Sequence, residues 1–476
     1  MKKIFVAGHF NVLHPGHLRL LKSAKELGGQ LIVAVESDEI AGDSAYVSED
    51  LRLDAIKNIS LVNEAFIMRE PLIDTLKKIK PNIVVKGKEH EFSENLESQV
   101  LKKYGGKIIF SSGEAMFSSL DLLKKEFDFL DRDFIKLPEN YLSRHKIKKT
   151  NLVNIINKFS DLNVCVLGDL IVDDYIICDP LGMSQEDPTI VVTPIGNEKF
   201  IGGAAIVAAH ASNFTSNTHF FSVTGKDEAA NFSLKELKSF KVKSSLLKDE
   251  TRPTTLKQRF RCSGKTMLRV SYLHQNAISL KIQNRIFSEF KKIVSKIDLL
   301  VFSDFNYGCL PQTLVDRIIN LANQKNIMMI ADSQSSSQVG DISRYKNMYV
   351  LTPTEREVRV SLKNSEDGLI ILAEKLRQQT DAKNILLKLG PAGLLIHAAK
   401  ENGKNFETDR IEALNCAPKD VSGAGDSLLI VAGMALAAGA DIWEASLLGS
   451  VAAAVQVSRL GNIPLERREL LSFFSK

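Results

Sequence analysis

Two histidines near the start of the chain, separated by a proline and a glycine, have the spacing of a phosphate-binding turn. The segment His14-Pro15-Gly16-His17 closely follows a short apolar run. Two imidazoles at this spacing can donate hydrogen bonds to a polyphosphate and stabilise the charge that develops as an α-phosphoryl group is transferred. The glycine lets the backbone approach a ligand closely. We therefore predict that His14 and His17 are catalytic residues of a phosphate-transfer site.

A second candidate site lies near the C-terminus, where two glycines and an aspartate precede a long run of small and apolar residues. Gly423-Ala424-Gly425-Asp426 is followed by residues 427–440, which predict a helix. Backbone N–H groups at the start of a helix bind anions, and a carboxylate beside them can accept the proton of an attacking hydroxyl. This combination is typical of kinase chemistry, with Asp426 as the base and the amides of Gly423, Ala424 and Gly425 as a nucleotide-binding anion hole.

The elements that must position the first site alternate between β-rich and amphipathic helical runs, which is the pattern of βαβ units and a parallel sheet. The expected strands are residues 3–10, 30–35, 65–68, 82–85 and 108–110, and the expected helices are residues 18–27, 49–59 and 72–79. His14 and His17 then lie just beyond the carboxyl end of the first strand, where open parallel sheets bind ligands. Lys86 follows the fourth strand at the same edge of the sheet.

The second site belongs to a larger series of the same kind. Its expected strands are residues 164–169, 299–302, 327–331, 349–351 and 385–389, with long helical runs between them. Three further β-rich runs belong to no βαβ unit, namely residues 189–192, 254–261 and 266–272. We expect a second α/β domain in which these extra strands form a small β-lid over a pocket.

The periodic spacing of hydrophobic residues stops between the two series, because residues 128–150 are rich in charge and show no period. Such a stretch is typical of a linker between domains. We therefore expect a first domain over residues 1–127, a linker over residues 128–150 and a second domain over residues 151–476. The fold class that follows is two-domain α/β, with a parallel sheet in the first domain and a larger α/β domain with a small β-lid after it.

Residues 8–17 resemble the signature of the nucleotidyltransferase superfamily, which contains cytidylyltransferases and sugar-phosphate adenylyltransferases: a strand, an aromatic residue and the His-x-Gly-His turn. The resemblance covers roughly residues 1–127 and implies that His14 and His17 polarise the triphosphate of ATP or CTP, with Mg²⁺. It also implies a Rossmann-like nucleotidyltransferase fold. The further nucleotide ligands that it implies are Phe10, Arg52, Lys86, Ser118 and Ser119.

Residues 152–470 resemble the ribokinase (PfkB) family of sugar kinases. The resemblance is carried by residues 168–175, by the Gly-Gly-Ala-Ala run that starts at Gly202, and by the motif that ends at Asp426. It implies that Asp426 is the catalytic base and that ATP is the phosphoryl donor. It also implies that Asp173, Gly202 and Gly203 bind the sugar and that Glu357 is associated with magnesium.

Residues 183–188, 303–308 and 351–353 resemble the heptose-phosphate kinase branch of that family more closely. The two halves together resemble the bifunctional heptose kinase/adenylyltransferases that supply nucleotide-activated heptose for lipopolysaccharide, with the domain order reversed. The resemblance implies a bifunctional enzyme acting on sugar phosphates and nucleotides. Three positions depart from the kinase pattern, because Ile206, Ser271 and Thr354 stand where the family carries Asn, Asp and Asn.

Because of those departures a second hypothesis stays open. In it the protein is a single-activity cytidylyltransferase of the glycerol-phosphate or sugar-phosphate type, and the kinase-like domain serves binding or dimerisation. The nucleotidyltransferase half departs as well, because Asn11 replaces the usual Asp after the aromatic residue. Loss of a hydrogen-bonding side chain removes recognition of particular substrate hydroxyls, so the sugar specificity is expected to differ from that of the family.

The overall composition is that of a globular protein and excludes several other classes. The net charge of +5 comes from 62 basic and 57 acidic residues, which argues against nucleic-acid binding. The five cysteines are widely spaced, so we expect reduced thiols rather than disulfides or a zinc site. No signal peptide is recognisable, and the longest apolar run, residues 428–440, is shorter than the roughly 18 residues of a membrane span. We expect a cytoplasmic protein with no membrane partner, and a homodimer.

Overall fold

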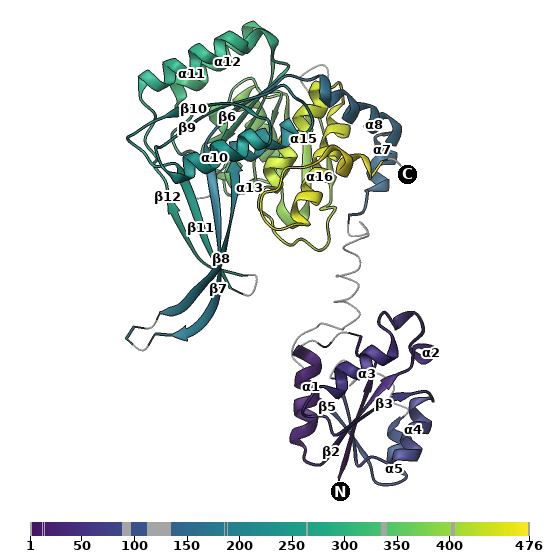
Figure 1. The fold of residues 1–476 in the computed structure, drawn as a ribbon. Helices are drawn as coiled ribbons and strands as arrows, with labels where there is room; N and C mark the ends of the chain where they lie inside the picture. Colours follow the sequence, from purple (N-terminus) through teal and green to yellow (C-terminus); the bar gives the residue numbers. More distant parts are fainter. Residues whose placement is uncertain are drawn as a thin grey trace. The chain divides into compact units, whose positions relative to one another are not determined.

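The chain folds as two compact units, Met1–Asp133 and Phe134–Lys476 (Figure 1). The computed structural model describes residues 2–11, 13, 15–87, 97–111, 135–184, 186–187, 189–262, 265–334, 340–400 and 405–474. His14, Ser118 and Ser119 lie outside these described residues. Each unit is described by itself below.

The first unit is a five-stranded parallel sheet with helices on both faces. Its strands are β1 (Lys3–Gly8), β2 (Gln30–Glu36), β3 (Glu64–Met68), β4 (Ile83–Gly87) and β5 (Lys107–Ser111), in the order β3-β2-β1-β4-β5. Its helices are α1 (Pro15–Glu26), α2 (Asp38–Ala41), α3 (Glu49–Lys57), α4 (Leu72–Ile79) and α5 (Glu97–Lys102), with a 3₁₀ turn η1 (Gly42–Ser44). The chain reverses its direction of travel across the sheet between β1 and β4, which makes the end of β1 a ligand-binding position.

Alternation along β1 divides the core of this unit in two. Ile4 and Val6 pack with buried residues of α1 and α3, including Leu21 and Ile56, on one face. Phe5 packs with α4 and α5 on the other face. Successive side chains of a strand point to opposite faces, so a strand covered by helices on both sides must be apolar throughout. This arrangement confirms the expected parallel sheet.

The second unit is built on a nine-stranded sheet in the order β10-β9-β6-β13-β14-β15-β16-β17-β18. Its strands are β6 (Val164–Gly168), β9 (Thr218–Thr224), β10 (Lys243–Lys248), β13 (Leu299–Asp304), β14 (Met328–Ser333), β15 (Val350–Leu351), β16 (Asn384–Lys388), β17 (Leu394–Ala399) and β18 (Phe406–Ile411). The strands from β10 to β16 are parallel, and β17 and β18 are antiparallel additions at one edge.

Helices cover both faces of this sheet and bury two separate cores. The α-helices of the unit are α7 (Glu139–Arg144), α8 (Lys149–Lys158), α9 (Ala204–Ser212), α10 (Glu228–Ser239), α11 (Leu280–Ile293), α12 (Gln312–Gln324), α13 (Glu355–Leu362), α14 (Leu369–Thr380), α15 (Ala424–Ala437), α16 (Ile442–Val457) and α17 (Arg467–Leu471). The first core contains α8, α9, α15 and α16, and the second contains α11, α12, α13 and α14. Short 3₁₀ turns η3 (Phe159–Asp161), η4 (Val294–Lys296), η5 (Ile342–Arg344) and η6 (Gly390–Ala392) complete the described elements.

A second, four-stranded sheet stands apart from the large one in the order β12-β11-β7-β8. Its strands are β7 (Leu170–Met183), β8 (Ile190–Gly203), β11 (Thr255–Cys262) and β12 (Lys265–Tyr272). The expected β-lid is thereby confirmed, and it is larger than the sequence predicted, because β7 was not expected and β8 is 14 residues long. Figure 1 shows their far halves extending as a two-stranded ribbon beyond β11.

The structure differs from the sequence prediction over residues 135–150, which were expected to be linker. They form α7 and the start of α8, and they belong to the second unit. The Tyr141 side chain is buried and its hydroxyl donates to the Trp443 carbonyl oxygen at 3.0 Å. Arg144 donates two hydrogen bonds to the Asp409 carboxylate. Residues 135–150 are therefore a packed part of the second unit, and the charged side chains of Lys136, Arg144, Lys146 and Lys148 lie on its surface.

Among the described helices, none has both the length and the apolar character needed to cross a membrane.

Candidate active sites

The turn after β1 holds the described part of the first site. His17 lies in the first turn of α1, and its ring is 5.1 Å from that of Phe10, centroid to centroid. Phe10 adopts a positive φ of 50° and is 2% exposed. Because it is part of the core, Phe10 positions His17 by packing against it. His14 lies outside the described residues, so the geometry of the histidine pair stays a prediction.

Arg52 is held by groups of the protein itself. Its guanidinium is fully buried and donates to the carbonyl oxygens of His9 and Val47, at 2.7 Å each, and to Asp38 at 2.5 Å. The Arg52 hydrogen bond holds the pKa of Asp38 below its usual value. These contacts tie the end of β1 to the segment after β2. Arg52 thus shapes the nucleotide turn, and a direct contact with nucleotide stays a prediction.

Lys86 lies near the end of β4, one strand from β1 at the same sheet edge. Its Nζ forms an ion pair with Glu97, the first residue of α5, at 3.0 Å. The side chain is 21% exposed. Asn11, which replaces the expected aspartate, donates to the Ser44 carbonyl oxygen and accepts from the Tyr46 amide. The structure therefore brings Phe10, His17 and Lys86 to one edge of the sheet.

The second site is a cavity of about 700 Å³ in the kinase-like unit, within the usual range for small-ligand sites. The N-terminus of α15, the end of β16 and the β-lid line it, and Gly423, Ala424, Gly425 and Asp426 all contribute. Gly423 has a φ of 77°, and a Cβ there would lie 2.5 Å from the Asn462 Oδ1. Glycine is required at this position because both the backbone and the space exclude a side chain.

Asp426 is buried in this cavity, and Gln334 donates to its Oδ1 at 3.3 Å. Desolvation by burial and the nearby Asp332 carboxylate raise the pKa of Asp426 to about 7, against the opposing effect of Lys388. A carboxylate whose pKa lies near neutral pH is suited to general-base catalysis. The carboxylate therefore lies beside the helix N-terminus, as the expected base and anion hole require.

The predicted sugar ligands lie together on the lid side of the cavity. Asp173 on β7 is 5% exposed, and it accepts from Asn462 at 3.3 Å and pairs with Arg259 at 3.1 Å. Its pKa is raised, chiefly by burial. A Cβ on Gly202 would lie 2.5 Å from the Asp173 Oδ2, and Gly203 has a φ of 59°. Gly202 therefore leaves room for the Asp173 carboxylate, and Gly203 turns the chain into α9.

Ile206, which replaces a sugar-binding Asn of the family, is fully buried in the core of α9. Glu357 lines the cavity, and one of its oxygens accepts the Thr354 amide at 2.7 Å in a helix cap. Among the residues that the structure describes, no three His, Cys, Asp or Glu side chains gather as a metal site. Glu357 therefore fits a Mg²⁺ held mainly by nucleotide phosphates and water, as is usual for this ion.

Several polar residues of the cavity were not predicted from the sequence, among them the four that follow. Lys257 and Arg259 come from β11, Gln334 follows β14, and Lys388 ends β16. The signal for Lys388 was present, since it is a charged residue at the carboxyl end of an expected parallel strand. Lys257 and Arg259 lie in the expected lid, but their alignment with Asp173 depends on the pairing of β11 with β7, which the sequence did not predict. The cavity wall also carries Cys416, which is exposed, whereas the other four cysteines are buried.

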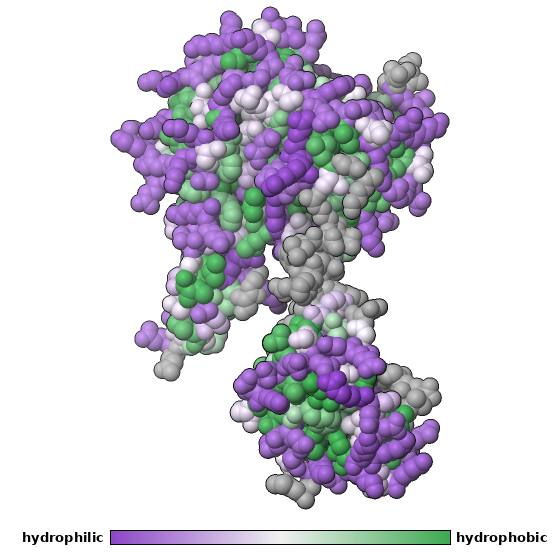
Figure 2. Space-filling view, turned by 45° about the vertical axis from the view of Figure 1, so that its right-hand side comes forward, coloured by the Kyte–Doolittle hydropathy of each residue, from purple (hydrophilic) through white to green (hydrophobic). Residues whose placement is uncertain are grey.

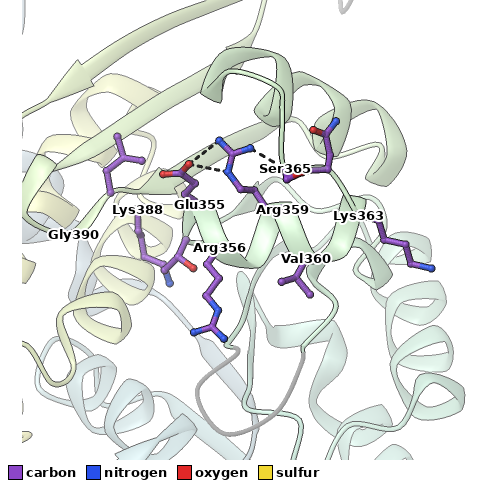
Figure 3. A pocket seen from close by; sticks show the side chains of 11 residues that line it. Glu355, Arg356, Arg359, Val360, Lys363, Ser365, Lys388 and Gly390 are labelled. Atoms are coloured by element: carbon purple, nitrogen blue, oxygen red, sulfur yellow. Dashed lines mark hydrogen bonds and ion pairs between the residues drawn. The ribbon is translucent and has the colours of Figure 1, made fainter.

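A second cavity, of about 710 Å³, adjoins the first and shares Lys388 with it (Figure 3). Side chains of α13 line it, including Arg356 and Arg359, and Arg359 pairs with Glu355 at 2.7 Å. Lys363 lies at its rim. The cavity is rich in cations and so favours an anionic occupant.

Comparison with curated proteins finds distant two-domain relatives. The chain is 28% identical over 317 residues to the bifunctional protein HldE of Campylobacter jejuni subsp. doylei, covering 65% of this chain and 64% of that protein. It is 27% identical over 327 residues to HldE of Syntrophotalea carbinolica, covering 68% of this chain and 65% of that protein. The chain thus spans just under two thirds of the length of the curated relatives it matches.

Solved structures share the fold of about two thirds of the chain. A ribokinase from Thermotoga maritima aligns with a TM-score of 0.52 and 21% identity, and phosphofructokinase-2 from Escherichia coli, in complex with potassium, with a TM-score of 0.54 and 16% identity. Each comparison covers 66% of this chain and all of the other. The ribokinase-like fold expected for the second domain is thereby confirmed.

Two family descriptions match separate parts of the chain. Residues 5–127 match the cytidylyltransferase-like family, and residues 161–468 match the pfkB family of carbohydrate kinases. The two matches fall on the two units that carry the His17 turn and the Asp426 cavity. The chain belongs to the pfkB family of carbohydrate kinases, and it carries a cytidylyltransferase-like domain ahead of the kinase domain.

Proposed function

We propose that this protein is a bifunctional enzyme of sugar-nucleotide synthesis. The second unit phosphorylates a sugar that already carries a phosphate, of the heptose-phosphate kind, from ATP. The first unit transfers a nucleotidyl group from ATP or CTP to a sugar phosphate and releases pyrophosphate. Family membership supports the two reaction classes, and the charge of the lid supports the choice of a phosphorylated sugar.

The observation that carries the substrate class is a row of cations on the inner face of the lid. In the lid sheet Lys257 is the direct neighbour of Asp173, and Arg259 is the direct neighbour of Arg269. All four residues line the cavity. Lys257 is 5% exposed and lies 5.2 Å from the Phe305 ring. On the lid these three cationic side chains accompany a single carboxylate, that of Asp173, and this local excess of positive charge favours an anionic ligand over a neutral sugar.

Substitution of Arg269 by an uncharged residue tests this substrate class. Arg269→Gln removes a cation from an exposed lid position and keeps a polar side chain of similar length. We expect kcat/KM for a sugar phosphate to fall roughly 10- to 100-fold, the cost of a lost charged hydrogen bond, while kcat/KM for the dephosphorylated sugar is unchanged. Arg261→Gln is the matched control, because Arg261 lies on the neighbouring lid strand β11, outside the cavity lining. Equal losses for both sugars would overturn the phosphate assignment.

Phosphoryl transfer in this cavity follows from the proposed roles. The substrate hydroxyl attacks the γ-phosphorus, its proton passes to the Asp426 carboxylate, and the bond from the γ-phosphorus to the β–γ bridging oxygen breaks to release ADP. The amides at the start of α15 stabilise the charge on the transferred group. Mg²⁺, when bound with the nucleotide, neutralises part of the phosphate charge. Asp173 orients the sugar by accepting hydrogen bonds from its hydroxyls.

The nucleotidyltransferase half is supported by the position of His17 at the end of β1. An imidazole at the N-terminus of α1 can donate to the triphosphate while the sugar phosphate attacks the α-phosphorus. His17→Ala is expected to abolish exchange of labelled pyrophosphate into ATP or CTP. His219→Ala is the control, because His219 belongs to β9 of the other unit. Exchange that persists in His17→Ala would contradict this assignment.

The competing hypothesis, a lone cytidylyltransferase with an inactive kinase-like unit, makes a different prediction. Under that hypothesis, the wild-type protein and Asp426→Asn release the same amount of ADP, and no sugar increases the release. The Asp426 pKa near 7 and the intact α15 N-terminus favour an active kinase, because neither is needed by a binding module.

We also propose that the protein is a homodimer, since the β7–β8 ribbon presents several large apolar side chains to solvent.

A further inference from the structure

Lys388 places an ammonium group beside the anion hole of the kinase cavity. Its Nζ donates to both carboxylate oxygens of Asp332, at 2.9 and 2.8 Å. The Lys388 side chain is 13% exposed and that of Asp332 only 1%. A Cβ built on Gly425 would lie 3.2 Å from the Lys388 Nζ. The cation is therefore in contact distance of the first turn of α15.

The strand order explains how this contact arises. β14 and β16 flank β15 and run parallel to it, so Asp332 and Lys388 leave the sheet at the same carboxyl edge. That edge faces the N-terminus of α15, and parallel sheets bind ligands there. Lys388 also lines both the kinase cavity and the adjoining cationic cavity (Figure 3).

A chain of polar contacts joins Lys388 to the proposed base. Asp332 accepts from the Gln334 Nε2 at 3.4 Å, and the same nitrogen donates to Asp426 at 3.3 Å. Lys388 thus reaches Asp426 through Asp332 and Gln334. Burial raises the pKa of Asp332 to about 6, against the effect of Lys388.

The local charge shows why a cation is needed at this point. Two buried carboxylates, Glu357 and Asp426, line the cavity, and a third, Asp332, lies directly behind the lining residues Lys388 and Gln334. An ATP molecule would add further negative charge to them. The free-energy cost of desolvating a buried lysine is offset only by anionic partners. A nucleotide phosphate beside the α15 amides is such a partner.

We propose that Lys388 is a catalytic residue of the kinase unit, whose ammonium contacts the γ-phosphoryl group of ATP at the anion hole. This inference rests on the proposed kinase function. Asp332 holds the ammonium in place, and Gln334 couples the pair to Asp426. As the substrate oxygen bonds to the γ-phosphorus and the bridging oxygen leaves with ADP, Lys388 offsets charge on the transferred group. Asp426 takes the hydroxyl proton.

The proposal has a kinetic test. Lys388→Met keeps the apolar length of the side chain and removes its charge. We expect kcat to fall about 10²- to 10³-fold, as for loss of one transition-state donor, with little change in the KM for the sugar. Lys388→Arg is expected to restore part of kcat. A Lys388→Met enzyme that keeps the wild-type kcat would overturn the proposal.

A second measurement tests whether the Lys388–Asp332 pair acts on Asp426, as the proposal requires. The charged groups that act on Asp426 are Asp332 on β14, Lys388 on β16, Asp173 on β7 and Lys257 on β11. Removing Lys388 withdraws a positive charge and raises the pKa of Asp426, so the acid limb of the kcat profile moves to higher pH. Asp332→Asn withdraws a negative charge and moves that limb to lower pH.

Opposite shifts in the two variants support the proposal, and equal or absent shifts contradict it. If Lys388→Met does not fold, Lys388→Gln, which also removes the charge, carries the same test, with melting temperatures as the folding check. Failure of the kinase function itself has a distinct signature, because wild-type protein and Asp426→Asn would then release the same amount of ADP with every sugar. Loss of ADP release in Asp426→Asn together with an unaffected Lys388→Met would refute only the role of Lys388.

Discussion

Asp426 combines burial with nearby charge of both signs, and this combination controls when it can act as a base. Its pKa of about 7 means that half of the carboxylates are protonated at neutral pH. A protonated carboxylate cannot accept the substrate proton, so activity must rise as the pH passes through this value. The same desolvation that raises the pKa makes the ionised form more basic than an exposed aspartate.

We therefore predict that kcat for sugar-dependent ADP release increases about tenfold from pH 6 to pH 7.5, as a single group with a pKa near 7 loses its proton. Asp426→Asn is expected to lower kcat by about 10²- to 10⁴-fold and to abolish this pH dependence. Initial rates at saturating ATP and sugar check both statements. A wild-type profile that is flat over this range would contradict the assigned base.

At the scale of the element, the start of α15 depends on one glycine. Gly423 has a φ of 77° and leaves 2.5 Å between its missing Cβ and the Asn462 Oδ1. Any side chain must displace Asn462, which also donates to Asp173. The helix N-terminus and the sugar site are therefore coupled through a single amide side chain.

Gly423→Ala is expected to lower kcat and to raise the KM for the sugar together, because it disturbs the anion hole and Asp173 at once. Strain of the left-handed backbone alone costs about 1–2 kcal/mol. Gly439→Ala is the matched control, since Gly439 also has a positive φ, of 96°, with nothing within 4 Å of a Cβ. Steady-state kinetics and melting temperatures of both variants check this. Identical kinetics in the two variants would show that strain, rather than the contact, matters.

The elements differ in how far sequence predicts them. The helix Leu72–Ile79 matches its expected bounds, because amphipathic spacing is a local property. The five strands β7, β9, β10, β17 and β18 were not predicted, and neither was the full length of β8. The outer part of the β7–β8 ribbon contacts few other residues, so its side chains carry no burial pattern for the sequence to reveal.

In the candidate sites, too, the sequence predicts local arrangements better than contacts between distant segments. The glycine-rich motif predicted that Asp426 and the amides before it lie together, since the motif and the helix it starts are contiguous in sequence. Asp332 and Gln334 come from the end of β14 and Lys388 from the end of β16, so only the strand order brings the lysine to the other two. Arg52 was predicted as a nucleotide ligand, but nothing in the sequence showed that the His9 and Val47 carbonyl groups already accept its hydrogen bonds.

At the scale of the whole molecule, the two units divide near residue 133, ahead of α7. The fragment 134–476 should therefore keep sugar-dependent ADP release at the wild-type kcat. The fragment 151–476 should melt at a lower temperature, because it loses the Tyr141 hydroxyl bond to Trp443 and the Arg144 pair with Asp409. Calorimetry of the two fragments measures the difference. Equal melting temperatures would show that α7 contributes nothing to stability.

The β7–β8 ribbon is the surface most suited to self-association. Figure 2 shows apolar side chains on it, and Leu181, Met183 and Ile195 are 66%, 62% and 60% exposed. A contiguous apolar patch of this kind marks an interaction surface. We predict that Leu181→Asp with Met183→Asp halves the mass measured by light scattering.

Leu234→Asp is the control for that change, because Leu234 is 52% exposed on α10, away from the ribbon. Its mass should remain that of the wild-type protein. A wild-type mass equal to that of one chain, 52.7 kDa, would exclude the dimer.

The exposed thiol of Cys416 turns the kinase cavity into a place where occupancy can be followed chemically. The other four thiols are buried, and burial strongly raises the pKa values of two of them, Cys165 and Cys309. A maleimide should therefore label Cys416 first, and the label adds a defined mass to an intact chain. Because this residue lies on the cavity wall, nucleotide or sugar phosphate should slow the labelling in proportion to the bound fraction. Ligands of the kinase unit can thus be ranked by alkylation rate and mass spectrometry, without any turnover.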